Sequence, residues 1–153
     1  MKKNRGQLLE DFSEALLSSV SGFVVRYKRT RARTQNESKA ENEYDLIIHN
    51  TSSLFPEFGN YVLVECKDWK NRVSYPQIAK FLHTIHARAC KTGILVAMKN
   101  ITHQKYNLTL HRAYDQDGIA VIVLDEGDIT NVLSGVINLS SLLRQKYERI
   151  KFG

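Results

Sequence analysis

Two short apolar runs restrict the fold of this chain more than any other feature of its sequence. They are residues 94–98 and 118–124, and neither carries a charged side chain. Runs that are apolar on both faces are typical of strands buried between two layers of helices. Residues 103–114, between the two runs, are expected to form a helix, and a strand–helix–strand order indicates parallel neighbours in a sheet. The sequence therefore predicts an α/β fold.

The segments before these runs are expected to add an antiparallel part to the sheet. The first predicted element is a helix at residues 5–20. Three strands follow, at residues 23–33, 44–48 and 61–66, and then a helix that begins at residue 74 and stops by Gly93. Ser74 and Gln77 have the spacing of a capping box, and Pro76 falls in the first turn of that last helix. The polar residues 34–42 are expected to form a loop.

The predicted architecture is a mixed β-sheet of about five strands flanked by helices, in the order α-β-β-β-α-β-α-β. Its core would occupy about residues 5–125, and a C-terminal helical extension, broken near Gly135, would occupy about residues 126–153. With 153 residues, 42% of them hydrophobic, the chain is expected to form a single domain, residues 1–153. Packing against the sheet and forming a dimer surface are both open for the extension.

The net charge and the cysteine content indicate which kinds of partner and which cellular compartment suit the chain. The formal net charge of +6 favours polyanionic partners such as nucleic acid, although many basic proteins bind none. Cys66 and Cys90 are too few for a disulfide framework or a zinc cluster, so both are expected to be reduced. No run approaches the ~18 apolar residues of a membrane span, so no membrane contact and a cytoplasmic location are expected.

Charged residues at the end of the third predicted strand mark the candidate site. Glu65 and Lys67 are expected to point to one side of that strand, and Cys66 to the other side, into the core. Asp45 begins the preceding strand and approaches Glu65 if the two strands pair antiparallel. Two adjacent carboxylates repel each other unless a cation lies between them. A hard divalent ion, Mg²⁺ with Mn²⁺ as a substitute, fits oxygen ligands of this kind.

This pattern resembles the PD-(D/E)xK nuclease superfamily, and within it the Mrr-like restriction endonucleases, over residues 6 to about 124. The resemblance rests on Asp45, on Glu65 to Lys67, on a Glu-bearing first helix and on Gln77 in the helix after the catalytic strand. The stretch from Gly6 to Glu10 is similar to the Gly-x-x-Phe-Glu opening of that group, with Leu9 in the aromatic position. The resemblance implies a restriction endonuclease-like fold and metal-dependent hydrolysis of DNA.

The resemblance also implies roles for the site residues, and these agree with metal-assisted hydrolysis. Asp45, Glu65 and the backbone carbonyl of Cys66 would hold one or two Mg²⁺ ions that lower the pKa of a bound water. Lys67 would orient that water and neutralise charge that develops on the phosphate. Glu10 would orient the metal ligands or bind a second metal.

Each assignment has a simpler structural alternative. Glu65 and Lys67 could form an ordinary ion pair at a sheet edge, with Asp45 as a turn residue. Gln77 is implied as a catalytic residue, but helix capping explains it equally well. Glu10 could belong to a solvated helix face, and Glu14, on the same face, is the second candidate for its role.

Basic and aromatic residues near the site are candidates for contact with DNA. Five cations within eight residues suit contact with a nucleic-acid backbone, or else form a solvated strand end. They are Arg26, Lys28, Arg29, Arg31 and Arg33. Trp69, Lys70 and Arg72 follow the catalytic strand, and Trp69 is expected either to stack on a base or to cover the core.

The sequence therefore predicts a metal-dependent endonuclease that cuts DNA. A Holliday junction resolvase shares the fold and the small size, and would need a symmetric dimer. A non-catalytic nucleic-acid-binding or assembly subunit would keep the fold without the chemistry, and the intact Asp45, Glu65 and Lys67 argue against it. Homodimerisation, the form of the nucleic acid and any sequence specificity are open.

Overall fold

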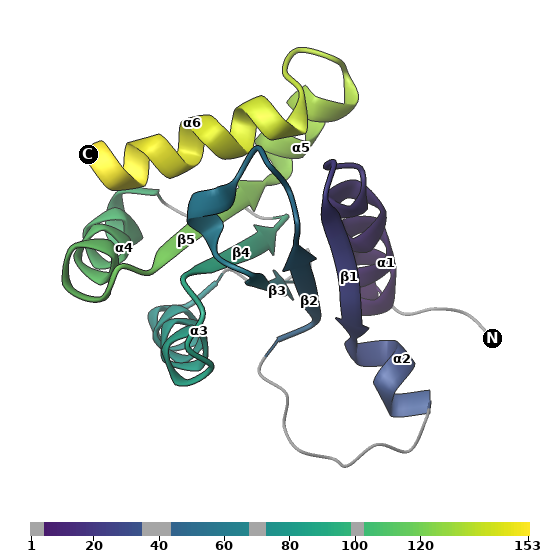
Figure 1. The fold of residues 1–153 in the computed structure, drawn as a ribbon, viewed down its shortest axis with the longest axis horizontal. Coiled ribbons are helices and arrows are strands. Elements are labelled where there is room, and N and C mark those ends of the chain that lie inside the picture. Colours follow the sequence, from purple (N-terminus) through teal and green to yellow (C-terminus); the bar gives the residue numbers. More distant parts are fainter. Residues whose placement is uncertain (1–4, 35–43, 68–72, 99–102) are drawn as a thin grey trace.

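A computed structural model describes residues 5–34, 44–67, 73–98 and 103–153 of the chain. Helices surround a central sheet in which the strands lie side by side (Figure 1). The elements are α1 (Arg5–Ser18), β1 (Phe23–Lys28), α2 (Arg29–Thr34), β2 (Leu46–Asn50), η1 (Pro56–Phe58), β3 (Tyr61–Lys67), α3 (Tyr75–Ala87), β4 (Thr92–Ala97), α4 (His103–Asp117), β5 (Ala120–Asp125), α5 (Glu126–Leu133) and α6 (Leu139–Phe152). None of the helices in the described ranges is long and apolar enough to cross a membrane.

The strands in the described residues form one mixed sheet in the order β1-β2-β3-β4-β5. β1, β2 and β3 pair antiparallel with their neighbours. β3, β4 and β5 pair in parallel, because α3 and α4 each return the chain to the same end of the sheet before the next strand begins. The predicted mixed sheet, with an antiparallel start and a parallel end, is confirmed.

Helices cover both faces of the sheet, and apolar side chains fill the two layers between them. α1, α5 and α6 pack on one face, where Ile122 and Leu124 of β5 are buried. α3 and α4 pack on the other face, which receives Val121 of the same strand. This division follows from the alternation of side chains along a strand. β4 is buried along its whole length, as predicted for a strand that is apolar on both faces.

The last helix belongs to the core. Leu143 of α6 is fully buried, and the ring of Tyr147 packs against that of Phe58 with their centroids 5.3 Å apart. The break predicted between α5 and α6 occurs at Gly135, whose φ of +79° is a conformation that favours glycine. Of the two roles left open for the C-terminal helices, the structure therefore shows packing against the sheet.

Close contact between α3 and β4 depends on a glycine. A Cβ atom on Gly93 would lie 2.4 Å from Cδ1 of Ile85 and 2.8 Å from Cζ of Phe81, both on α3. The start of α3 is also as predicted, since the backbone N–H of Ser74 donates to Oε1 of Gln77 at 2.9 Å. α3 thus begins at its capping residues and packs more closely on the sheet than any larger residue at position 93 would allow.

The strand predicted over residues 23–33 is too long. β1 ends at Lys28, and Arg29 begins the short helix α2. No large apolar residue follows Tyr27 before position 44, so a longer strand would have no apolar face to bury. The backbone N–H of Arg29 donates instead to the carbonyl oxygen of Asp45 at 2.9 Å. The loop predicted at residues 34–42 falls, apart from residue 34, outside the described residues.

Candidate active site

Asp45 and Glu65 meet where β2 begins and β3 ends. The antiparallel register pairs Leu46 with Val64. The next position along both chains places Asp45, which directly precedes β2, opposite Glu65. Asp45 is buried, and its Oδ2 accepts the backbone N–H of Cys66 at 2.8 Å. The backbone of β3 therefore holds the Asp45 carboxylate in place beside Glu65.

The end of β3 has the predicted alternation of side chains. Nζ of Lys67 lies 3.3 Å from Oε1 of Glu65, so these two charged groups share one side of the strand. Cys66 contacts α1 instead, with its Sγ 3.4 Å from the hydroxyl of Ser13. Burial raises the pKa of the Cys66 thiol well above its ordinary value, and the charge of Asp45 adds to that effect. Cys66 therefore acts as a small core residue between two site residues.

Glu65 has a strongly perturbed carboxyl group. Burial, and after it the negative charge of Asp45, raise the pKa of Glu65 to about 8, although Lys67 opposes this shift. Without another cation, Glu65 therefore retains a proton at neutral pH. Carboxylate oxygens are hard ligands, and a divalent ion between the two carboxylates would offset both the burial of Glu65 and its repulsion by Asp45. The chemistry of this donor pair fits Mg²⁺.

The immediate surroundings limit how such an ion could be held. Within the described ranges, no group of three or more His, Cys, Asp or Glu side chains has the geometry of a metal site. An ion at this position would therefore need ligands besides side chains, and the Cys66 carbonyl next to Glu65 is one candidate. Asp45 also has a cationic neighbour, because the Arg29 guanidinium lies 3.5 Å from its Oδ1.

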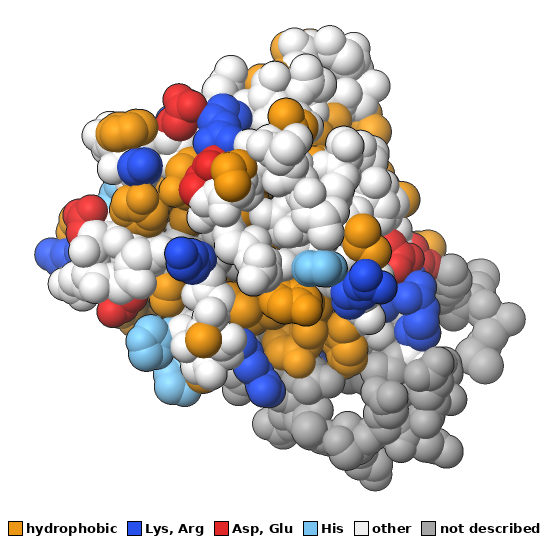
Figure 2. Space-filling model, viewed as in Figure 1, with side chains coloured by type: hydrophobic (Ala, Val, Ile, Leu, Met, Phe, Trp, Pro, Cys, Tyr) orange, Lys and Arg blue, Asp and Glu red, His pale blue; other side chains and the backbone are white. Residues whose placement is uncertain are grey.

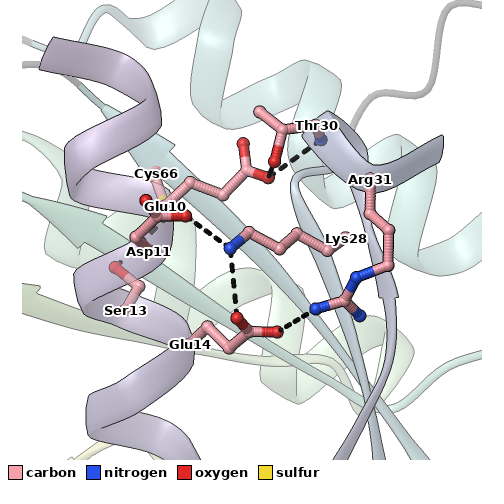
Figure 3. Close-up of polar contacts among 8 residues, drawn as sticks. All are labelled: Glu10, Asp11, Ser13, Glu14, Lys28, Thr30, Arg31 and Cys66. Carbon is pink, nitrogen blue, oxygen red and sulfur yellow. Dashed lines mark hydrogen bonds and ion pairs between the residues drawn. The ribbon is translucent and has the colours of Figure 1, made fainter. Parts of the chain in front are cut away.

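Glu10 is the third carboxylate near this centre. It lies on α1, is 4% exposed, and its Oε1 accepts the backbone N–H of Thr30 at 3.0 Å and the Thr30 hydroxyl at 2.8 Å (Figure 3). Burial raises the pKa of Glu10, the bonds from Thr30 oppose this rise, and the charge of Asp45 adds to it. Thr30 directly follows Arg29, whose backbone N–H bonds to the Asp45 carbonyl, so these contacts bring Glu10 near the same acidic centre.

Glu14, the second candidate for the role of Glu10, lies in a different environment. Its Oε1 accepts a hydrogen bond from Nζ of Lys28 at 3.1 Å, and its Oε2 lies 3.2 Å from the Arg31 guanidinium (Figure 3). Lys28 also bonds to Asp11. Burial opposes the charge on Lys28, but these carboxylate bonds prevail and its pKa is raised. Glu14 is thus part of an ion-pair network between α1 and the end of β1.

The basic segment is not one continuous cationic strand. Lys28 has a side chain only 10% exposed, and Arg31 is paired with Glu14. Arg26 lies exposed on β1, and Arg29 faces Asp45 from the first turn of α2. Figure 2 shows blue and red side chains next to each other over α1, β1 and α2. The predicted arrangement of five cations along a single strand is therefore wrong, because the chain turns at residue 29 and acidic residues of α1 neutralise part of the set.

Of the remaining predicted residues, Gln77 caps a helix, and the others lie wholly or partly outside the described structure. Gln77 lies at the start of α3, and its side chain accepts the Ser74 N–H, which is the capping role. Trp69, Lys70 and Arg72 lie outside the described residues, and the side chain of Arg33 is not described. Thr30 is not among the predicted site residues, and its partner Glu10 is twenty positions away in the chain. No local motif could have identified it.

The fold defines a class of protein. A five-stranded mixed sheet flanked by helices is consistent with a restriction endonuclease-like nuclease domain. A family model described as restriction endonuclease, Mrr_cat, matches residues 1–130. The chain therefore belongs to the Mrr_cat restriction endonuclease family, and the resemblance inferred from its sequence is confirmed. Comparison with curated proteins finds no match.

Proposed function

We propose that this chain is a metal-dependent endonuclease that hydrolyses phosphodiester bonds in DNA. The observation that carries the proposal is the buried pair of Asp45 and Glu65, with Lys67 at 3.3 Å from Glu65. Such a pair is costly to bury as an ordinary structural feature, because each carboxylate raises the free energy of the other. Membership of a nuclease family supports the same reading.

Asp45, Glu65 and the carbonyl oxygen of Cys66 would hold Mg²⁺, with Mn²⁺ as a substitute. When bound, the ion would lower the pKa of an attacking water and stabilise negative charge on the phosphate. Asp45 is positioned for this role by the Cys66 N–H, which fixes one of its oxygens. Glu65 would exchange its proton for the ion, since its raised pKa results partly from the neighbouring carboxylate.

Lys67 would act directly on the reacting groups. Its side chain is 26% exposed, so the ammonium can reach solvent and a bound phosphate while it remains next to Glu65. A fixed positive charge at this point stabilises the negative charge that develops on the phosphate, and can orient the attacking water. Glu10 would support the ligand set from α1, and Gln77 would contribute from the start of α3.

DNA would approach over the basic residues that are not neutralised by α1. Arg26 is exposed, and Arg29 lies beside the acidic centre, so both suit contact with phosphates. Arg33, Trp69, Lys70 and Arg72 remain proposed contacts from the sequence. Lys28 suits this role poorly, because its ammonium is buried against Asp11 and Glu14.

The test is cleavage of linear, supercoiled, branched and single-stranded DNA with Mg²⁺, Mn²⁺ or EDTA. Wild type should cut only with metal, and Asp45→Ala and Lys67→Ala should each lower the rate by about 100-fold or more. Lys151→Ala, at an exposed position on α6, is the matched control and should cut like wild type. Selective cutting of branched DNA would assign a junction resolvase. Binding without cutting under any metal would reject the nuclease and assign a DNA-binding subunit.

A further inference from the structure

The corner where β1 turns into α2 reaches across to α1 and holds one carboxylate of the candidate site. We call residues 28–31 the β1–α2 corner. From this corner, the backbone N–H and the hydroxyl of Thr30 both donate to Glu10, at 3.0 and 2.8 Å (Figure 3). Both bonds fall on Oε1 of Glu10, so Oε2 is the oxygen that this contact leaves for another ligand.

The contact with Thr30 matters because the Glu10 carboxylate is buried. Glu10 is 4% exposed, and a buried carboxylate is unfavourable unless hydrogen bonds or a cation compensate for lost water. Lys28, the first residue of the corner, directs its ammonium to Asp11 and Glu14, which follow Glu10 on α1. Thr30 therefore provides two hydrogen bonds that compensate the Glu10 carboxylate for the water it loses on burial.

The same corner fixes the helix that carries Glu10. Lys28 bonds to Asp11 and Glu14, which are one and four positions after Glu10 on α1. Arg31 adds a bond to Glu14 at 3.2 Å. In the sequence of the corner, Lys28 precedes Thr30 and Arg31 follows it, so bonds to α1 flank the Thr30 contact. They restrict rotation and sliding of α1, so the direction of the Glu10 side chain is determined by the corner.

We propose that Thr30 is a positioning residue that orients Glu10 toward the metal-binding centre of Asp45 and Glu65, without making Glu10 a direct metal ligand. The inference rests on the proposed function, because it assigns a metal to Asp45 and Glu65. Thr30 would touch neither metal nor DNA. Its effect would pass through Oε1 of Glu10, with Oε2 acting on the metal through a bound water.

The experiment compares Thr30→Val with Thr30→Ser in the full chain. Valine has nearly the shape of threonine but lacks the hydroxyl, whereas serine keeps it. Mn²⁺ and Mg²⁺ affinity is measured by calorimetry, and thermal unfolding is followed separately in EDTA. Thr30→Val should weaken metal binding by about 10-fold, and Thr30→Ser should restore it to within about 3-fold of wild type. Thr130→Val, at an exposed position on α5, should bind metal like wild type.

A double-mutant cycle with Glu10→Gln tests whether Thr30 acts through Glu10. Thr30→Val should add no further loss of metal affinity when Glu10 is already replaced. Wild-type metal affinity in Thr30→Val, or fully additive losses in the cycle, would overturn the inference while leaving the proposed function intact. If wild type itself binds no divalent metal, both proposals fail. If Thr30→Val does not fold, the metal affinities of Thr30→Ser and Glu10→Gln are compared instead. Thr30→Ser should bind metal more tightly than Glu10→Gln, and equal affinities of these two variants would overturn the inference.

Discussion

At the scale of single residues, the proton on Glu65 couples the chemistry of the site to the stability of the protein. Burial and the charge of Asp45 raise the pKa of Glu65 from 4.5 to about 8 on folding. The folded state therefore binds this proton more tightly than the unfolded state. The group contributes stability that is fully present below about pH 4.5 and is lost as the pH rises through about 8.

The direction of this pKa shift predicts how the stability of the metal-free protein depends on pH. In EDTA, the free energy of unfolding of wild type should fall between about pH 5 and pH 8, by at most ~1.4 kcal/mol per pH unit. Glu65→Gln resembles the protonated form at every pH, so its stability should depend much less on pH in this range. Urea unfolding at a series of pH values measures both curves. Parallel curves would show that Glu65 does not carry the proton.

At the scale of elements, the packing of α3 on β4 gives a second prediction. Gly93→Ala should lower the free energy of unfolding by about 1–3 kcal/mol, because the new methyl would overlap the Ile85 and Phe81 side chains. Ile85→Val removes the closest atom, Cδ1. The double variant should therefore be less destabilised than the sum of the single variants, as measured by urea unfolding. Simple additivity would mean that the Ile85 contact is not the cause.

Elements with a local signal could be predicted from the sequence, and those that depend on distant contacts could not. β4 and β5 are continuous apolar runs, and α3 begins at a capping pair, so each is specified by its own residues. β1 and α2 differ, because the turn at Arg29 is fixed by the Asp45 carbonyl and by Glu10. The same limit applies to the site. Asp45, Glu65 and Lys67 follow from strand alternation and pairing, whereas the contact between Thr30 and Glu10 has no sequence pattern.

At the scale of the whole molecule, the core extends beyond the matched family region. The family match ends at residue 130, but α6 contributes Leu139, Leu142, Leu143 and Tyr147 to the layer that covers β5. The face of the sheet that α6 covers includes Ile122 and Leu124, which are 0% and 1% exposed. Without α6, these side chains would lose much of their cover. We therefore infer that the described residues from α1 to α6 unfold as one cooperative unit, as the proposal of a single domain requires.

Leu143→Ala tests this inference. Leu143 is 0% exposed, so its truncation should lower the free energy of unfolding by about 2–5 kcal/mol. Leu133→Ala, at a position 66% exposed on α5, is the matched control and should change stability by less than about 0.5 kcal/mol. Hydrogen exchange should show the amides of β4 and α6 losing protection together in Leu143→Ala, because one core connects them. Loss of protection confined to α6 would instead show that the helix unfolds by itself and that the nuclease fold is stable without it.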